Sequence, residues 1–165
     1  MLDFFIKANN IIIVVSNLEK IGKMKMDIRS GYLDIAVAII QNGEHVLIAQ
    51  RSQYQSHPGK WEFPGGKVEP SEALEDCLKR ELLEELEIKI RVGERFLVFE
   101  HNYEPLDKKI HRFFSFWCEI LEGKPLLKEH QNLAWVRIEE LSNYDFIEAD
   151  IQLVEILLIK EKKAL

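Results

Sequence analysis

Residues 66–88 read GKVEPSEALEDCLKRELLEELEI, which combines a glycine and a proline with a long run of acidic and apolar residues. Pro70 and Ser71 are predicted to open a helix, with Ser71 as its N-cap. An apolar stripe at helical spacing then carries the helix to about Leu86. The members of the stripe are Leu74, Cys77, Leu78 and Leu82. The segment therefore predicts a turn followed by one amphipathic helix.

The same helix carries three glutamates on one face. Glu84 follows Glu81 by three residues and Glu85 follows it by four, so the carboxylates lie together. A divalent cation would turn this repulsive cluster into a ligand set, and carboxylate oxygens suit Mg²⁺ or Mn²⁺. Gly65 and Gly66, just before the helix, allow the backbone to approach a ligand closely. The alternative interpretation is a solvated acidic helix face after an ordinary glycine turn.

Extended segments flank this helix in the sequence. Runs of β-branched and aromatic residues predict strands over residues 32–40, 45–50, 61–63, 88–103, 110–121 and 133–138. Asn42-Gly43 predicts a type I′ hairpin turn, which needs two positive φ angles. Regular structure is expected to break at residues 64–66, and residues 105–107 are expected to form a turn.

A second helix is predicted over residues 147–163. Its apolar side is expected to contain Ile151, Val154, Ile156, Leu157 and Leu158. Strands combined with two helices predict an α/β sandwich, in which helices cover both faces of one mixed sheet. Residues 31–165 are expected to form this single domain.

The first 30 residues are set apart as an N-terminal leader. Residues 4–15 are apolar, but a membrane-spanning helix needs about 20 such residues, and the flanks of a signal peptide are missing. The leader is expected to form an extra strand or to be poorly ordered. No association with a membrane is predicted.

The negative charge of the chain is concentrated in one segment. The formal net charge of the 165 residues is −6, and residues 69–87 alone hold eight acidic residues against Lys79 and Arg80. Such a patch repels a polyanionic duplex and attracts cations, so stable nucleic-acid binding is not expected. Cys77 and Cys118 form no disulfide framework, which favours two reduced thiols in a cytoplasmic protein.

The acidic helix and its preceding loop resemble the Nudix box. That motif is a glycine, five residues, a glutamate, seven residues and then Arg-Glu-apolar-X-Glu-Glu-X-Gly-apolar. The matching positions are Gly66, Glu72, Arg80, Glu81, Leu82, Glu84, Glu85 and Ile88. One position departs, because Glu87 stands where the family has glycine. A glutamate in the left-handed conformation of that helix end should cost about 1 kcal/mol.

The resemblance implies a Nudix fold, an α/β/α sandwich, and a Mg²⁺-dependent hydrolase that cleaves nucleoside triphosphates to the monophosphate and pyrophosphate. Mn²⁺ is a possible substitute for Mg²⁺. The implied metal ligands are the Gly65 carbonyl and the carboxylates of Glu81, Glu84, Glu85 and Glu129. These four glutamates are also the implied catalytic residues, and the base that activates water stays open among Glu81, Glu84 and Glu129. Arg80 is expected to pair with a neighbouring glutamate and orient it.

The run WEFPGGKVE at residues 61–69 resembles the MutT branch, which removes oxidised purine triphosphates such as 8-oxo-dGTP. The substrate residues implied by this likeness are Arg51, Phe63, Gly66, Lys67 and Asp150. Asp150 stands where that branch has an asparagine that reads the base. The Ala149-Asp150-Ile151 pattern also resembles a sister group that acts on CTP and modified deoxycytidine triphosphates. An ionised carboxylate only accepts hydrogen bonds whereas an amide also donates, so the base stays undecided.

Each of these substrate and late-loop residues also has a plain structural interpretation. Arg51 could form an ordinary salt bridge, Phe63 could be a core aromatic residue and Asp150 could cap the last helix, and Glu129 could lie in a surface loop. Other histidines show no metal-ligand spacing and are expected to be ordinary loop or strand residues; they are His57, His101, His111 and His130.

Three further functions compete with 8-oxo-dGTP hydrolysis. They are a CTP-type pyrophosphohydrolase, a hydrolase of nucleoside diphosphate sugars or dinucleotides, and a catalytically silent module that binds a nucleotide. The intact glutamate cluster speaks against the silent module, because a binding module has no need to hold so many like charges together. The expected partner is the nucleotide substrate, and the protein is expected to be a monomer or a homodimer.

Overall fold

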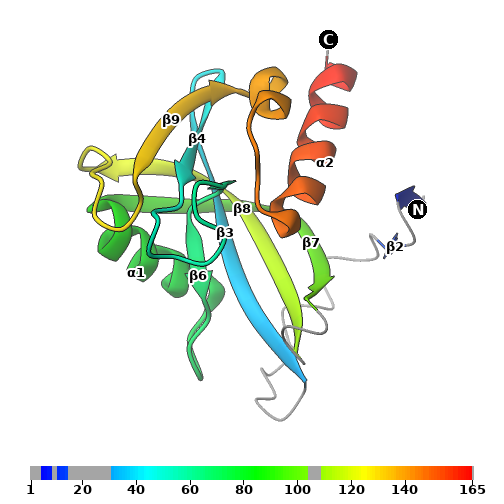
Figure 1. Ribbon diagram of the computed structural model, residues 1–165, viewed down its shortest axis with the longest axis horizontal. Helices are drawn as coiled ribbons and strands as arrows, with labels where there is room; N and C mark the ends of the chain where they lie inside the picture. The colour runs from blue at the N-terminus through cyan, green and yellow to red at the C-terminus, as the bar shows by residue number, and fades with distance from the viewer. Residues whose placement is uncertain (1–4, 9–10, 15–30, 104–108, 165) are drawn as a thin grey trace.

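The computed structural model describes residues 5–8, 11–14, 31–103 and 109–164. Seven strands form the main sheet (Figure 1). They are β3 (Tyr32–Asn42), β4 (His45–Gln50), β5 (Trp61–Glu62), β6 (Gly65–Lys67), β7 (Lys89–Asn102), β8 (Ile110–Glu122) and β9 (Asn132–Arg137). The main path runs β5-β4-β3-β8-β7, with β6 paired to β3 and β9 paired to β4. Strands β3 and β8 are parallel and the other pairs are antiparallel, so the sheet is mixed as expected.

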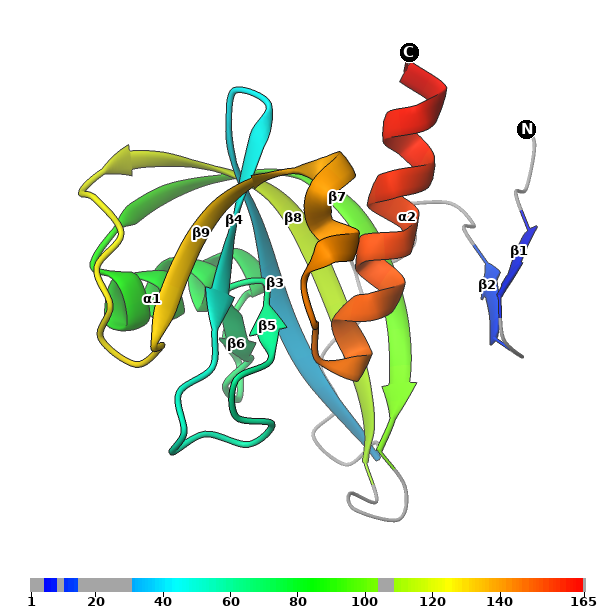
Figure 2. The same cartoon turned by 45° about the horizontal axis from the view of Figure 1, so that its top comes forward.

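Two helices cover opposite sides of this sheet (Figures 1 and 2). Helix α1 (Leu74–Leu86) buries the predicted stripe of Cys77, Leu78 and Leu82 in one apolar cluster. Helix α2 (Glu148–Ala164) and the short 3-10 helix η2 (Ile138–Asn143) cover a second cluster, which contains Leu141, Leu153 and Leu157. The side chains of successive strand residues alternate between the two clusters, as for Ala38 and Ile39. The α/β sandwich predicted from the sequence is therefore confirmed.

Two short strands lie within the leader. Strand β1 (Phe5–Ala8) pairs antiparallel with β2 (Ile11–Val14), and the two form a separate two-stranded sheet. The leader thus contains a hairpin where one extra strand or poor order was expected. The turn expected at residues 105–107 lies outside the described residues. No helix in the described part of the chain has the length and apolar character needed to span a membrane.

Two irregular segments predicted near the glycines differ from the structure in their positions. The turn between β3 and β4 lies at Gly43 and Glu44, because Asn42 already pairs with His45 in the ladder. Gly43 has a positive φ and Glu44 has not, which differs from the two positive angles of a type I′ turn. The break expected at residues 64–66 falls at Phe63 and Pro64, between β5 and β6, whereas Gly65 and Gly66 belong to β6.

The start of α1 also differs from the prediction. Ser71 has a φ of 69° and lies in a turn before the helix, and Ala73 is the N-cap, without a side-chain hydrogen bond. The carboxylate of Glu72 accepts a hydrogen bond from the Glu69 N–H at 2.9 Å, which stabilises this turn. The side chain of Glu72 thus replaces the serine in closing the chain reversal that leads into the helix.

The predicted buried side of α2 is confirmed at Val154, Ile156 and Leu157. Ile151 is 46% exposed instead, and Leu153 is fully buried. The buried face of the helix begins with Ala149 and Asp150 in its first turn. A sequence pattern of apolar residues alone does not reveal that Asp150 is buried.

The end of α1 provides a first testable prediction. Glu87 adopts the left-handed conformation, with φ 58° and ψ 36°, as expected for the glycine position of the motif. Its side chain forms only a solvent-exposed ion pair with Lys128, at 3.3 Å, which contributes little. We expect Glu87→Gly to stabilise the protein by about 1 kcal/mol. Urea unfolding measures this, with Glu87→Ala as the control that removes the ion pair and keeps the strain. A glycine variant no more stable than the alanine variant would contradict the prediction.

Candidate active site

The two glycines before α1 are required by close packing. Strand β6 pairs with the middle of β3, where Gly65 lies opposite Val37 and Gly66 opposite Ala36. A Cβ atom on Gly65 would lie 2.2 Å from the Ala36 carbonyl oxygen, and one on Gly66 would lie 2.1 Å from Cδ of Glu81. The backbone of β6 is thus pressed between β3 and the Glu81 carboxylate. A Cβ at Gly65 would meet backbone, so only glycine fits there, whereas a Cβ at Gly66 would require the Glu81 side chain to move.

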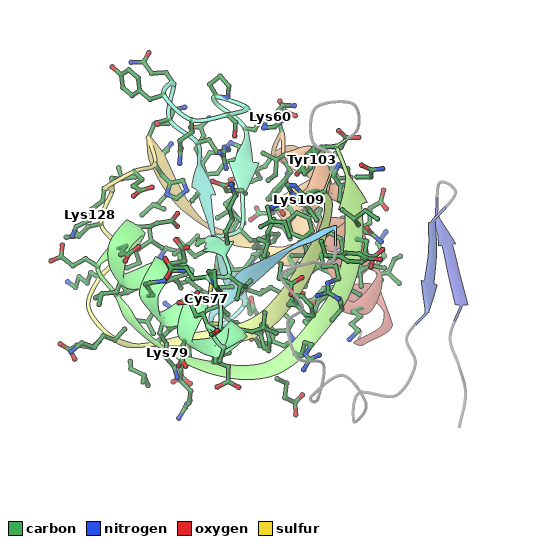
Figure 3. All side chains as sticks on the ribbon, turned by 90° about the horizontal axis from the view of Figure 1, so that it is seen from below. Lys60, Cys77, Lys79, Tyr103, Lys109 and Lys128 are labelled. Atoms are coloured by element: carbon green, nitrogen blue, oxygen red, sulfur yellow. The ribbon has the colours of Figure 1, made fainter. Side chains whose placement is uncertain are left out.

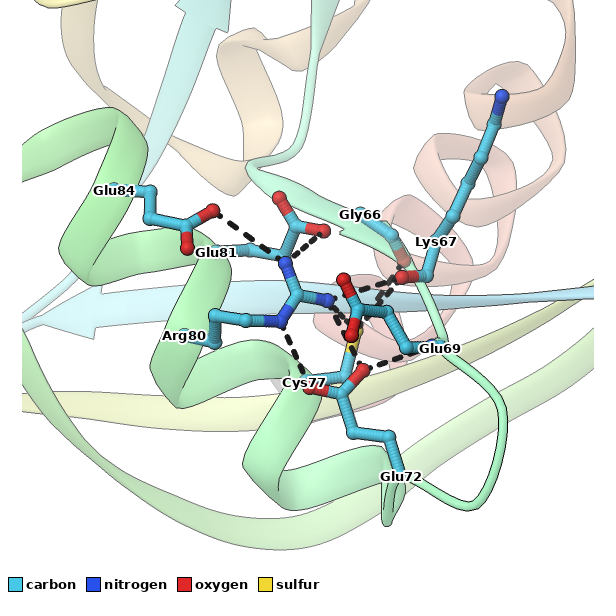
Figure 4. A network of polar contacts seen from close by, with 8 residues as sticks. All are labelled: Gly66, Lys67, Glu69, Glu72, Cys77, Arg80, Glu81 and Glu84. Atoms are coloured by element: carbon cyan, nitrogen blue, oxygen red, sulfur yellow. Dashed lines mark hydrogen bonds and ion pairs between the residues drawn. The ribbon is translucent and has the colours of Figure 1, made fainter.

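Arg80 organises the acidic face of α1 (Figure 4). Its guanidinium forms a double hydrogen bond with the Glu72 carboxylate, Nε–Oε1 at 2.8 Å and Nη2–Oε2 at 3.0 Å. Nη1 also donates to Glu81 at 2.8 Å and to Glu84 at 3.5 Å, and Nη2 donates to the carbonyl oxygen of Lys67. The hydrogen bonds to Arg80 lower the pKa of Glu72 to about 2. The expected pairing of Arg80 with neighbouring glutamates is confirmed.

Glu85 is an acid of the site whose pKa is strongly raised. Its burial, followed by the nearby charge of Glu62, raises the pKa of the carboxyl to about 9. The charges of Glu81 and Glu129 act in the same direction, which places these acids in one electrostatic neighbourhood. Among the described residues, Glu85 Oε2 is buried and has no hydrogen-bond partner. An unpaired buried carboxylate oxygen destabilises the fold, so it indicates a site for a cation.

The residues present fit a hard divalent cation. Glu81, Glu84 and Glu85 supply carboxylate oxygens, and Glu81 packs against Gly66 at the edge of β6. Within the described residues, no three acidic, histidine or cysteine side chains already converge into a closed metal site. Arg80 explains this arrangement, because it draws Glu81 and Glu84 toward itself. A bound cation would compete with Arg80 for these two carboxylates and satisfy the free oxygen of Glu85.

A cavity of about 460 Å³ adjoins the glycines. The predicted substrate residues that line it are Arg51, Phe63, Gly66, Lys67 and Asp150. Phe63 is also a core residue, 4% exposed and stacked on Phe146 with ring centroids 5.6 Å apart. Its packing interpretation is confirmed, and its substrate role stays a prediction. The structure therefore brings together residues that are up to about a hundred positions apart in the chain.

Asp150 lies at the buried end of this cavity. Strand β5 holds the start of α2 beside it, through hydrogen bonds from Trp61 N to Asp145 O and from Ile147 N to Trp61 O, each 2.9 Å. Asp150 Oδ2 then accepts a hydrogen bond from the Phe63 N–H at 2.7 Å. The carboxyl is 1% exposed, and burial raises its pKa to about 8. Asp150 anchors Phe63 and does not cap the helix with its side chain.

A charged cluster beside the cavity was missed in the sequence. Glu62 Oε2 lies 2.5 Å from Arg51 Nη1, and Glu62 Oε1 lies 3.0 Å from Nε2 of the buried His130. Arg51 thus forms the ordinary salt bridge that was considered as an alternative to substrate binding. It also lines the cavity. A signal for Glu62 existed, because an acid between two aromatic residues in a strand is rarely buried without a partner. His130 is a loop residue, as expected, but it is buried and bonded to Glu62.

A larger hollow, of about 770 Å³, lies at the opposite end of the sheet. Gly43, Trp117 and Trp135 are among its lining residues, and neither the two glycines of β6 nor any predicted substrate residue lines it. We therefore place the chemistry at the smaller cavity, where the glycines, Glu62 and Asp150 meet.

Comparison with known proteins identifies the family. The NUDIX domain model matches residues 32–155, which include the main sheet, α1 and the first half of α2. The chain belongs to the Nudix family. The Nudix box therefore corresponds to β6, the turn at Glu72 and α1, and the Nudix fold expected from the motif is confirmed.

Individual Nudix relatives carry two different substrate names. The CTP pyrophosphohydrolase of Escherichia coli K12 is 39% identical over 123 residues, which cover 74% of this chain and 89% of that protein. The 8-oxo-dGTP diphosphatase of the same organism is 38% identical over 117 residues, which cover 69% and 87%. The solution structure of the E. coli ORF135 protein matches with a TM-score of 0.66 and 34% identity, over 76% of this chain and 88% of that one. The two identities are too similar to separate the two substrates.

Proposed function

We propose that this Nudix protein is a Mg²⁺-dependent pyrophosphohydrolase that converts a nucleoside triphosphate into the monophosphate and pyrophosphate, with 8-oxo-dGTP or a similar damaged nucleotide as substrate. The supporting observation is the unpaired buried Oε2 of Glu85 beside Glu81 and the glycines. Glu81, Glu84, Glu85, Glu129 and the Gly65 carbonyl would hold the cation. The cation supplies charge neutralisation for the phosphates and acidifies a bound water.

The residues of the chain account for the rest of the reaction. A carboxylate takes a proton from water, and the resulting hydroxide attacks a phosphorus atom of the triphosphate. The bond from that phosphorus to its bridging oxygen breaks, and pyrophosphate leaves with the electron pair. Glu81, Glu84 and Glu129 are the candidates for the base, because each belongs to the acidic cluster around the site. Lys67, exposed at the rim of the cavity, is positioned to attract the phosphate chain.

The buried end of the cavity would receive the base. Because its pKa is about 8, Asp150 holds a proton at neutral pH and can then donate as well as accept, as an amide does. This supports the 8-oxo-dGTP assignment, since the MutT branch has an asparagine at the matching position. The CTP-type alternative is favoured by the acid itself, which after ionisation only accepts from an amino group.

The activity is assigned to residues 31–165 as one domain acting in the cytoplasm. Both Cys77 and Cys118 are buried and free of disulfides, which suits a reducing compartment.

A panel assay tests the proposed function. Purified protein with Mg²⁺ is incubated with CTP, dCTP, the six other common triphosphates, 8-oxo-dGTP and a nucleoside diphosphate sugar, and the released pyrophosphate and nucleoside monophosphate are measured. We expect pyrophosphate and monophosphate from 8-oxo-dGTP at the highest kcat/KM. Preferential turnover of CTP would select the alternative, and no release from any triphosphate would overturn the proposal.

The selection of the base should depend on pH through Asp150. Below its pKa the carboxyl both donates and accepts, and above it the carboxylate only accepts. We expect the ratio of kcat/KM for 8-oxo-dGTP to that for CTP to fall about tenfold from pH 6 to pH 9, the effect of one hydrogen bond. In Asp150→Asn the ratio should stay constant, because the amide keeps an acceptor for Phe63 N and always has a donor. The same pH dependence in both proteins would show that Asp150 does not read the base.

A further inference from the structure

Both carboxylate oxygens of Glu62 are occupied by groups of the protein. Oε1 is bonded to His130 Nε2 at 3.0 Å and Oε2 to Arg51 Nη1 at 2.5 Å, and its side chain is 12% exposed. Glu85, in contrast, has a free oxygen. Glu62 is therefore held in one position among the acids of the site. One of its two bonds holds the side chain of His130.

His130 belongs to the loop that joins β8 to β9, residues 123–131. Its side chain is 1% exposed. Among the described residues, Nε2 bonds to Glu62, and Nδ1 is buried without a hydrogen-bond partner. A carboxylate oxygen accepts, so Nε2 carries the proton in this bond. The next residue, Gln131, donates its N–H to the Gln50 carbonyl at 2.9 Å.

The same loop is attached at a second point, at the end of α1. Leu126 N donates to the carbonyl of Leu86 at 2.9 Å, and Lys128 pairs with Glu87 at 3.3 Å. In the view of Figure 3, Lys128 lies beside α1. Glu129 lies between the attachment to α1 and the attachment through His130. Its charge acts on Glu85, so the loop brings this acid to the cluster on α1.

We propose that His130 is a positioning residue, which holds the 123–131 loop against Glu62 so that Glu129 faces Glu85 across the metal site. This inference rests on the proposed function, since it gives Glu129 its place in that reaction. The side chain of Glu129 is exposed and long, so its position depends on where the backbone of the loop is fixed. The buried hydrogen bond between His130 and Glu62 fixes the backbone of the loop. Through Glu62 this bond also connects the loop to Arg51 and the cavity.

Two substitutions of His130 separate the effect of its hydrogen bond from the effect of the bulk of its ring. In His130→Gln the amide nitrogen reaches about as far as Nε2 and can donate to Glu62, whereas His130→Ala removes the bond. His45→Ala, at the opposite end of β4, is the matched control for losing a histidine. If His130→Ala does not fold, His130→Asn replaces it, because its shorter amide keeps a polar side chain without reaching Glu62.

The first measurement needs neither metal nor nucleotide. Amide hydrogen exchange at Gln131 reports the attachment of the loop to Gln50. We expect exchange at Gln131 to be faster by roughly tenfold or more in His130→Ala, and close to wild type in His130→Gln and His45→Ala. Unchanged exchange in His130→Ala would overturn the proposal, whatever the activity of the protein.

The second measurement separates positioning from general stability. We expect His130→Ala to lower kcat/KM about 10- to 100-fold and to raise the Mg²⁺ concentration for half activation, with His130→Gln restoring most of both. In a Glu129→Gln background the same substitution should have little further effect, because His130 acts through Glu129. Equal losses in His130→Ala and His130→Gln, or fully multiplicative losses with Glu129→Gln, would overturn the proposal. Absence of any pyrophosphate release by wild type would instead overturn the proposed function, and the exchange measurement would still decide the role of His130.

Discussion

Replacing Glu85 with glutamine is expected to lower kcat by roughly 100-fold or more. Glutamine has the same shape but a neutral amide, so it keeps the packing of α1 and loses the charge that would bind the cation. The buried Oε2 of Glu85, unpaired among the described residues, is the atom that this substitution changes. Steady-state release of pyrophosphate at saturating Mg²⁺ measures the effect. Glu84→Gln should lower turnover as well, since Glu84 lies on the same face of the helix.

Stability provides the control for Glu85→Gln. The pKa of Glu85 is raised above its unfolded value, to about 9, mainly by burial. Its contribution to stability is therefore complete at low pH and is lost as the pH rises toward 9. Without metal, Glu85→Gln should be at least as stable as wild type, and its advantage should grow from pH 5 to pH 8. Wild-type turnover in both glutamine variants would remove the metal assignment, whereas low turnover with a large loss of stability would leave only a folding defect.

The sequence predicted the parts of the fold in which the pattern is local. The apolar stripe of α1, the long strands β7 and β8 and the glutamates on one helix face all follow from spacing within one element. The residues of the turn between β3 and β4 were harder to predict, because the register of the ladder between these strands determines which residues form the turn. Helix α2 shows the same limit, since Asp150 replaces an apolar residue at a core position and only its bond to Phe63 N makes that burial possible.

The sequence predicted those residues of the candidate site that belong to a motif. It did not predict those that depend on contacts between distant parts of the chain. His130 and Glu62 are 68 positions apart, and their bond forms only because β4 lies beside both β5 and β9. Local sequence gives no reason for a buried histidine next to Glu129. Glu62 belongs to the segment 61–69 that resembles the MutT branch. The acids of α1 were enough to explain a metal site, so no role was predicted for Glu62.

Replacing Gly65 with alanine is expected to destabilise the protein by about 3 kcal/mol, at the upper end of the cost of overpacking. The added Cβ would lie 2.2 Å from the Ala36 carbonyl oxygen and 3.0 Å from Val37 Cα, both in the backbone of β3. Backbone in the centre of a sheet cannot swing away, so β6 has to separate from β3. Urea unfolding measures the loss. Gly31→Ala is the matched control, because nothing lies within 4 Å of its Cβ position.

Gly66→Ala separates the structural from the functional need for glycine in the same strand. Its added Cβ would meet Cδ, Oε1 and Cγ of Glu81, the movable end of a side chain. The carboxylate can turn away, so the fold should persist with a smaller loss of stability than in Gly65→Ala. Glu81 is then displaced from the position where it would bind the cation, and turnover should fall although the protein stays folded. If Gly66→Ala retains wild-type turnover, close packing of β6 against Glu81 serves stability alone, and the Glu81 ligand assignment is wrong.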